Sequence, residues 1–186
     1  MKLTKTTPLK SVVVLLFLLI MGTPPAFSQA DNIFSKMDFL IGSWEFDAKS
    51  LMPDGTYQPQ VFYSDVSYIF GGNASKDDFM FKNENGETII YGSTIRSYDA
   101  QAGKWKMLWY NFNLSFITEM TGDYVDGEFH FNGEGRDERG DYLEKIVFYD
   151  ISENQYSWKS DKSYDNGQTW LKDFFSYTAS RIAAEE

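Results

Sequence analysis

From about residue 43 onward, hydrophobic and polar residues alternate with a period of two between short turns rich in glycine and asparagine. This alternation is typical of strands that turn one face to a core and the other to water. Turns such as Pro53-Asp54-Gly55 and Asp165-Asn166-Gly167 supply the positive φ angles that tight hairpins need. The pattern predicts ten strands, over 43–50, 57–71, 77–83, 87–98, 103–112, 115–125, 127–134, 142–151, 155–162 and 168–181.

Helical periodicity occurs once within residues 31–186. Ile33, Phe34, Met37 and Ile41 fit one face of a short N-terminal helix. Eight to ten short strands joined by tight turns, with no crossover helix, favour an all-β fold, an antiparallel up-and-down barrel. A β-sandwich is the alternative, because Greek-key connections leave no trace in the sequence.

The first thirty residues have the pattern of a secretory signal peptide. Three lysines precede a continuous apolar run over 12–21, and prolines and small residues follow up to Ser28 or Ala30. The apolar run is about half the ~20 residues that a membrane-spanning helix needs. We therefore expect residues 1–30 to be cleaved and residues 31–186 to form one exported domain, periplasmic or secreted, without a membrane span.

Composition narrows the choice of partners. Without the three lysines of the first thirty residues, 14 basic residues face 27 acidic ones, a net charge of −13. Such a surface repels nucleic acid and anionic lipid headgroups. The chain has no cysteine and a single histidine, so we expect no metal site and no cofactor. Aromatic residues form about a fifth of residues 31–186, enough to fill a core and to line a cavity.

Two features near the ends of the predicted barrel belong together. Gly42-Ser43-Trp44 opens the first strand and Arg181 closes the last one. The combination resembles the signature of the calycin superfamily, the lipocalin-like proteins, in which the tryptophan closes the barrel floor and the arginine lies across its ring. The resemblance implies a structural role for Gly42, Trp44 and Arg181, with a cation–π contact between the last two.

Further motifs over residues 98–181 resemble a family of bacterial secreted lipocalin-like proteins known only as a domain of unknown function. They are Tyr98-Asp99, Gly103-Lys104-Trp105, Phe148-Tyr149-Asp150-Ile151, Tyr156-Ser157-Trp158 and the segment from Ser163 to Trp170. This resemblance implies the barrel fold and carries over no catalytic residue.

Strand alternation indicates which side chains face inward. In the first strand Trp44, Phe46 and Ala48 alternate with charged residues, and in the last strand Arg181 must share the interior with Trp44. The residues that we expect to line the interior and to contact a ligand are Phe46, Tyr91, Met107, Trp109, Met120, Phe131, Trp158, Asp173, Phe175 and Tyr177.

Asp173 is the unusual member of this set, because a carboxylate in an aromatic interior needs a partner. It is an error of alternation, a partner of a buried polar group, or a functional anchor. His130 invites comparison with haem proteins of the same superfamily, but the inward alternation of Phe129 and Phe131 turns it outward, which favours a surface histidine. The acidic pairs Asp77-Asp78 and Asp137-Glu138 are expected to be solvated loop charges.

The segment from Ser163 to Trp170 matches the Asp-box pattern S-x-D-x-G-x-T-W of β-propellers. A propeller repeats the box once per blade, whereas this chain has it once. We therefore expect a stabilised hairpin, with a carbohydrate role as the alternative.

Three functions fit these features. The first is binding of a small hydrophobic molecule inside the barrel, with Asp173 as polar anchor. The second is an enzyme of isomerase, cyclase or hydrolase type on the same scaffold, with Asp173 and an interior tyrosine as acid and base. The third is a filled barrel that acts as an envelope interaction module through exposed Tyr110 and Phe112. A hollow interior would favour the first function.

Overall fold

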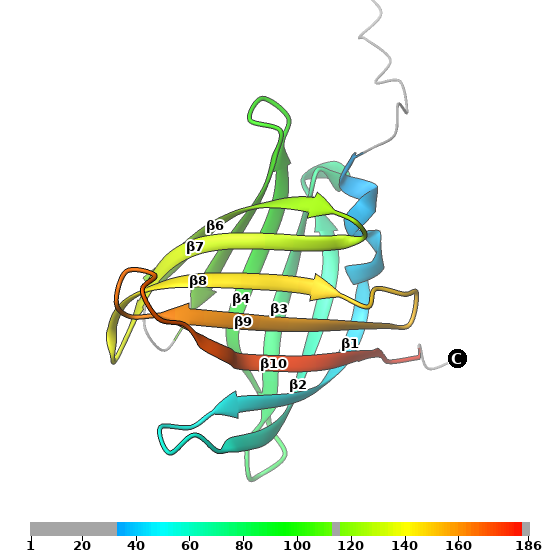
Figure 1. The fold of residues 1–186 in the computed structure, drawn as a ribbon. Coiled ribbons are helices and arrows are strands. Elements are labelled where there is room, and N and C mark those ends of the chain that lie inside the picture. Colours follow the sequence, from blue (N-terminus) through cyan, green and yellow to red (C-terminus); the bar gives the residue numbers. More distant parts are fainter. Residues whose placement is uncertain (1–32, 113–115, 184–186) are drawn as a thin grey trace, which may run out of the picture. The chain divides into compact units, whose positions relative to one another are not determined.

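Ten antiparallel strands form a closed barrel (Figure 1). The computed structural model describes residues 33–112 and 116–183, so the predicted signal peptide over residues 1–30 lies outside the described residues. Each strand pairs with the next in the chain, and β10 returns to pair with β1, which confirms the up-and-down barrel and excludes the sandwich. The strands are β1 (Gly42–Leu51), β2 (Tyr57–Ile69), β3 (Ala74–Lys82), β4 (Thr88–Asp99), β5 (Lys104–Asn111), β6 (Phe116–Val125), β7 (Glu128–Asp137), β8 (Gly140–Tyr149), β9 (Gln155–Ser163) and β10 (Leu171–Arg181).

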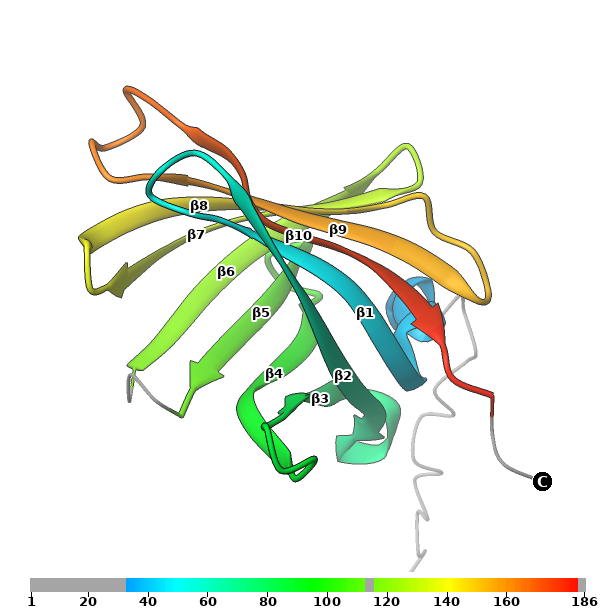
Figure 2. The ribbon, with the colours of Figure 1, turned by 90° about the horizontal axis from the view of Figure 1, so that it is seen from below.

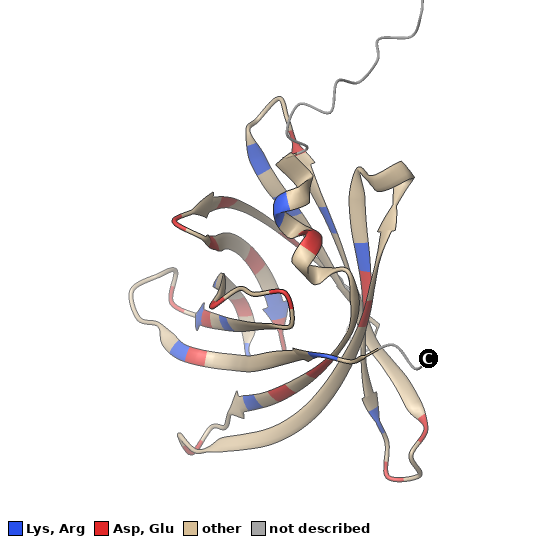
Figure 3. Ribbon diagram, turned by 90° about the vertical axis from the view of Figure 1, so that its right-hand side faces the viewer, with Lys and Arg blue, Asp and Glu red and all other residues tan. Residues whose placement is uncertain are grey.

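A 3₁₀ helix, η1 (Ile33–Leu40), precedes the barrel beside the start of β1 (Figure 2) and covers one end of the barrel (Figure 3). Its buried residues are Phe34, Met37 and Leu40, which recur every third position. The α-helical face predicted for this segment is wrong in detail, since a 3₁₀ helix has three residues per turn and so buries Leu40 in place of Ile41. A second short 3₁₀ segment, η2 (Phe70–Gly72), connects β2 to β3.

Side chains of the turns explain why the strands reverse where they do. Asp54 accepts hydrogen bonds from the N–H and the hydroxyl of Thr56, at 2.9 and 2.7 Å. Asn83 does the same for the N–H groups of Asn85 and Glu87. These local bonds satisfy backbone donors that the strand ladders leave free.

The end covered by η1 is closed by Trp44 and Arg181. The guanidinium carbon of Arg181 lies 4.2 Å from the Trp44 ring centroid, and the group donates hydrogen bonds to the carbonyls of Phe39, Ile41 and Glu153. Gly42 has a φ of 125°, and a Cβ there would overlap the guanidinium. The geometry confirms the cation–π contact predicted from the sequence.

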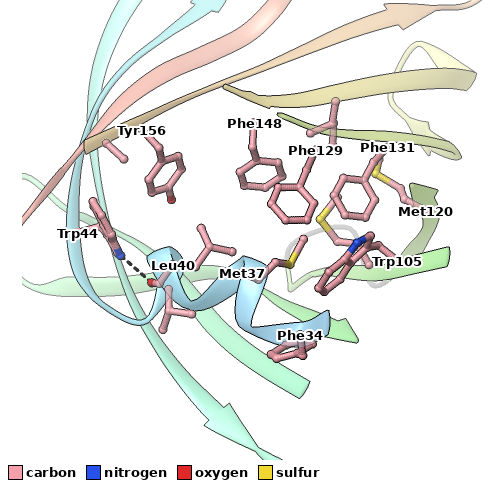
Figure 4. Close-up of a cluster of buried hydrophobic side chains, with 14 of the residues drawn as sticks. Phe34, Met37, Leu40, Trp44, Trp105, Met120, Phe129, Phe131, Phe148 and Tyr156 are labelled. Carbon is pink, nitrogen blue, oxygen red and sulfur yellow. Dashed lines mark hydrogen bonds between the residues drawn. The ribbon is translucent and has the colours of Figure 1, made fainter. Parts of the chain in front are cut away.

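The core lies directly beneath η1 (Figure 4). The Trp44 indole N–H donates to the carbonyl of Leu40 at 2.7 Å, which ties the helix to β1. Rings of η1 and of several strands meet there, with Phe34 of η1 packed on Trp105 of β5 and Trp44 of β1 edge-on to Tyr156 of β9. This half of the barrel is therefore filled by its own side chains.

Charged residues of both signs are spread over the strands and turns of the barrel (Figure 3). Among the residues that the structure describes, no helix has the length and apolar character needed to cross a membrane.

Candidate binding cavity

Beyond this filled end the barrel is hollow. The cavity has a volume of about 450 Å³, and its lining includes no residue of η1. Cavities that bind small molecules measure about 300–1,000 Å³. A barrel of this kind either fills with side chains or holds one small ligand, and this one does both, in different halves.

Eight of the ten residues predicted to contact a ligand line this cavity. They are Phe46, Tyr91, Met107, Trp109, Met120, Trp158, Phe175 and Tyr177. Phe131 faces inward as predicted but lies in the filled core, where its ring packs on Phe148 at 6.1 Å. Strand alternation therefore predicted direction well and depth along the barrel less well.

The prediction that Asp173 faces the cavity is wrong, and of its three interpretations the error of alternation is the one that the structure shows. The pairing of β10 with β9 shifts between Leu171 and Phe175, and Asp173 within this bulge has a φ of 47°. Its N–H donates to the Asp161 carboxylate at 2.9 Å, and its side chain does not line the cavity. The bulge adds residues to one strand, so alternation counted back from Arg181 fails beyond Phe175, and Phe174 lines the cavity instead.

Two charged residues that were not predicted to line the interior form a buried ion pair on the cavity wall. Arg96 on β4 and Asp77 on β3 are 5% and 6% exposed, and Nη1 lies 2.5 Å from Oδ2. Burial opposes the charge on Arg96, but Asp77 outweighs it and raises the pKa of the guanidinium above its ordinary value. The expectation that Asp77 is a solvated loop charge is wrong, because β3 begins three residues earlier than predicted.

A second polar group occupies the wall made by β7, β8 and β9. The Lys162 ammonium lies 3.2 Å from the Asp137 carboxylate and 3.6 Å from the Tyr142 ring centroid, and Tyr164 donates to Asp137 at 2.6 Å. Burial alone would raise the pKa of Asp137. Hydrogen bonds from the Tyr164 hydroxyl and the Arg139 backbone N–H, together with the Lys162 ammonium, instead hold this pKa below its ordinary value. Asp137 is thus held by an ion pair and by hydrogen bonds, in contrast to the solvated loop charge expected.

Glu144 belongs to the same wall. It lines the cavity, is 9% exposed, and sits opposite Lys162 in the β8–β9 ladder. Burial raises the pKa of its carboxyl group, and the nearby Lys162 and Ser160 only partly offset this.

A strip of stacked aromatic rings lines the cavity from β9 through β10, β1 and β2 to β3. Trp158 and Tyr177 are parallel to within 4° at 5.1 Å, and Tyr177 stacks on Phe46 at 4.4 Å. Phe46 continues onto Phe79 at 5.4 Å, and Phe79 onto Phe62 at 4.6 Å. The strip crosses five strands and presents a continuous apolar surface.

Glycines keep the cavity open. A Cβ at Gly92 would overlap the Trp109 ring, and one at Gly135 would overlap the Tyr142 ring. Because these glycines have no side chain, both rings lie against the barrel wall.

The sequence did contain a signal for the cavity residues of β8 that were not predicted. Buried residues alternate strictly along this strand, at Tyr142, Glu144, Ile146 and Phe148. The signal was masked because both faces of the strand carry polar and apolar residues.

The other sequence motifs lie away from the cavity. His130 is on the outer face of the barrel, as predicted, and its Nε2 lies 3.0 Å from Oε2 of Glu128. Tyr110 and Phe112 pack edge-to-face at 5.1 Å and are exposed. Within residues 33–112 and 116–183, no three or more His, Cys, Asp or Glu side chains are grouped to hold a metal ion.

The predicted hairpin over 163–170 is confirmed. Asp165 accepts hydrogen bonds from Ser163 and from both the N–H and hydroxyl of Thr169, and the Trp170 indole donates to the Gly167 carbonyl. These bonds lower the pKa of Asp165 to about 2. The Asp-box here is a turn brace.

Comparison with known proteins supports the fold. No family model and no curated protein matches the sequence. Among solved structures, an S-type phycobiliprotein lyase from Guillardia theta matches with a TM-score of 0.57 and 16% identity, over 87% of this chain and 100% of that one. At this identity the likeness shows the fold alone, a closed antiparallel barrel.

Proposed function

We propose that this protein binds a small, largely apolar molecule inside its barrel. The single observation that carries the proposal is the cavity of about 450 Å³, walled by stacked aromatic rings and edged by a few buried polar groups. Predominantly apolar walls with few polar groups are typical of small-molecule sites. The likeness to a phycobiliprotein lyase is consistent with this function. The enzymatic alternative loses its proposed acid, because Asp173 does not line the cavity.

The proposal is tested with a neutral apolar dye, N-phenyl-1-naphthylamine, whose fluorescence rises on leaving water. Thr94 lines the cavity, whereas its neighbour Ile95 faces outward. We expect Thr94→Phe to weaken dye binding by about tenfold or more, by filling the site, and Ile95→Phe to leave it unchanged. Near-ultraviolet circular dichroism confirms that both variants are folded. Equal binding by Thr94→Phe and wild type, or no binding by wild type, contradicts the proposal.

We also propose that the protein is exported, with the segment over residues 1–30 removed. The support is the sequence pattern of that segment, three lysines followed by the apolar run over 12–21. Intact mass of the protein recovered from outside the cytoplasm is expected to correspond to a chain beginning after Ser28 or Ala30. A full-length chain retained in the cytoplasm contradicts this.

A further inference from the structure

The charge state of the cavity wall constrains what can bind there. Both cations that line the cavity are already neutralised, Arg96 by Asp77 at 2.5 Å and Lys162 by Asp137 at 3.2 Å. Buried charges are stable only when paired, and separating either pair to serve a ligand would leave a carboxylate without its partner. Among the residues that the structure describes, the cavity therefore offers no free positive charge to an anionic ligand such as a fatty-acid carboxylate.

Glu144 is the acidic group of this wall without an ion pair among the described residues. Its ladder partner Lys162 is held by Asp137 and by the Tyr142 ring, and on its other side it pairs with Gly133, which carries no charge. A carboxylate in such a place loses its hydration without gaining a salt bridge, and burial accordingly raises the pKa of Glu144. The neutral acid, by contrast, has an O–H to donate and is tolerated in an apolar cavity.

The aromatic strip adds a requirement on shape. Its rings, from Trp158 through Tyr177 and Phe46 to Phe79 and Phe62, stack with interplanar angles between 4° and 27°. Because the rings cover one another's faces, they leave their edges to a ligand, and aromatic edges gain most from the face of a flat partner in edge-on geometry. Trp158, at one end of the strip, lies on β9 next to the strand that carries Glu144.

Building on the proposed function, we infer that the ligand is a neutral, planar conjugated molecule whose carbonyl oxygen accepts a hydrogen bond from the Glu144 carboxylic acid. Neutrality follows from the paired cations, planarity from the aromatic strip, and the carbonyl from the donor that Glu144 presents. Lys162 and Asp137 hold each other in place and leave the Glu144 proton to the ligand.

The inference is tested with three probes of stated chemistry, which are 2-methyl-1,4-naphthoquinone, 2-methylnaphthalene and dodecanoate. Binding is followed by quenching of tryptophan fluorescence and by calorimetry. Because the chain has no cysteine, the quinone is not captured by thiol addition. In the wild type we expect the quinone to bind more tightly than dodecanoate.

Variants of Glu144 separate the hydrogen bond from general packing. Glu144→Leu is expected to weaken quinone binding by about tenfold, the size expected for one lost hydrogen bond. Binding of methylnaphthalene, which has no acceptor for that bond, is expected to change by less than about twofold. Glu144→Gln keeps an N–H donor and is expected to stay within about threefold of wild type. Glu119→Leu, the same change at an exposed outer position, is the matched control and is expected to alter neither.

A pH series supplies a second readout. Ionisation removes the Glu144 proton, so quinone binding by the wild type is expected to weaken as the pH rises, and binding by Glu144→Gln is expected to stay level. Lys162, Asp137 and Tyr142, which face Glu144 from β9, β7 and its own strand, are unchanged in that variant. A pH dependence that persists in Glu144→Gln overturns the assignment to Glu144.

The remaining outcomes are equally decisive. Equal losses of quinone and methylnaphthalene in Glu144→Leu, a Glu144→Gln variant as weak as Glu144→Leu, or tighter binding of dodecanoate than of quinone overturns the inference while the proposed function stands. If the wild type binds neither aromatic probe nor the dye, the proposed function fails, and this inference fails with it.

Discussion

Individual residues at the closed end explain why a short motif predicts a fold. Trp44 is fully buried, its indole N–H is bonded to Leu40, and Arg181 covers its ring while donating to three backbone carbonyls. Lysine could not replace this arginine, because only the planar guanidinium can stack on the ring and fan out to several acceptors. The two residues thus join the first strand, the last strand and η1.

At this scale we predict that Trp44→Ala lowers the free energy of unfolding by about 3–5 kcal/mol, through the lost contacts and the cavity left behind. Urea denaturation measures it. Trp170→Ala, which truncates a half-buried tryptophan on the β9–β10 hairpin, is the control and is expected to cost less. An unfolding midpoint for Trp44→Ala equal to that of wild type would show that the ring does not support the barrel.

Single residues also mark the limit of sequence reasoning at the site. Strand alternation assigned Trp109 and Tyr177 to the interior correctly, because a period of two is imposed by the backbone itself. The same reasoning missed Asp77, Arg96 and Glu144, since charged residues are exposed by default and only their neighbours reveal that they are buried and paired.

Among the elements, the β9–β10 hairpin shows how a turn motif stabilises strand pairing. Ser163 and Thr169 donate to the Asp165 carboxylate across the turn, and Gly167 takes a φ of 85°. The bulge in β10 begins just beyond this hairpin. Because of this bulge, Asp173 does not follow the alternation of inward and outward side chains along β10. The sequence of a single strand does not reliably reveal a bulge.

The hairpin predicts a dependence of stability on pH. Its hydrogen bonds lower the pKa of Asp165 from 3.8 to about 2, so the stabilisation is present above about pH 4 and is lost as the pH falls toward 2. Asp165→Asn is expected to lower the thermal midpoint at neutral pH, with the difference from wild type shrinking between about pH 4 and pH 2. Glu138→Gln, in an exposed turn, serves as control. A difference that stays constant over this range would contradict the assignment.

The whole molecule combines a filled half with a hollow half. The closed circuit of ten strands leaves no free sheet edge, so the barrel does not need a complete core to avoid edge-to-edge association. Side chains from η1 and the surrounding strands supply the packing at one end. The other end can therefore remain open for a ligand without loss of the fold.

At the scale of the molecule we predict that an occupied cavity stabilises the entire barrel. A ligand that binds only the folded state, at about 100 times its Kd, adds about 2.7 kcal/mol to the free energy of unfolding. The thermal midpoint of the wild type is expected to rise with the concentration of N-phenyl-1-naphthylamine, and that of Thr94→Phe is expected to rise much less. A rise of the same size in both would place the dye outside the cavity.

The sequence by itself determined the ten strands, their turns, the inward direction of most aromatic residues and the closure by Trp44 and Arg181. These features depend on local backbone geometry and on short motifs, which a linear pattern records. Only the tertiary structure decided that half of the barrel is hollow, that Asp77 pairs with Arg96 and Asp137 with Lys162, and that Asp173 lies in a bulge while Glu144 faces the cavity. Those features arise when the barrel closes, because depth along the axis and contact between strands are set by register and by the space that distant side chains leave to one another.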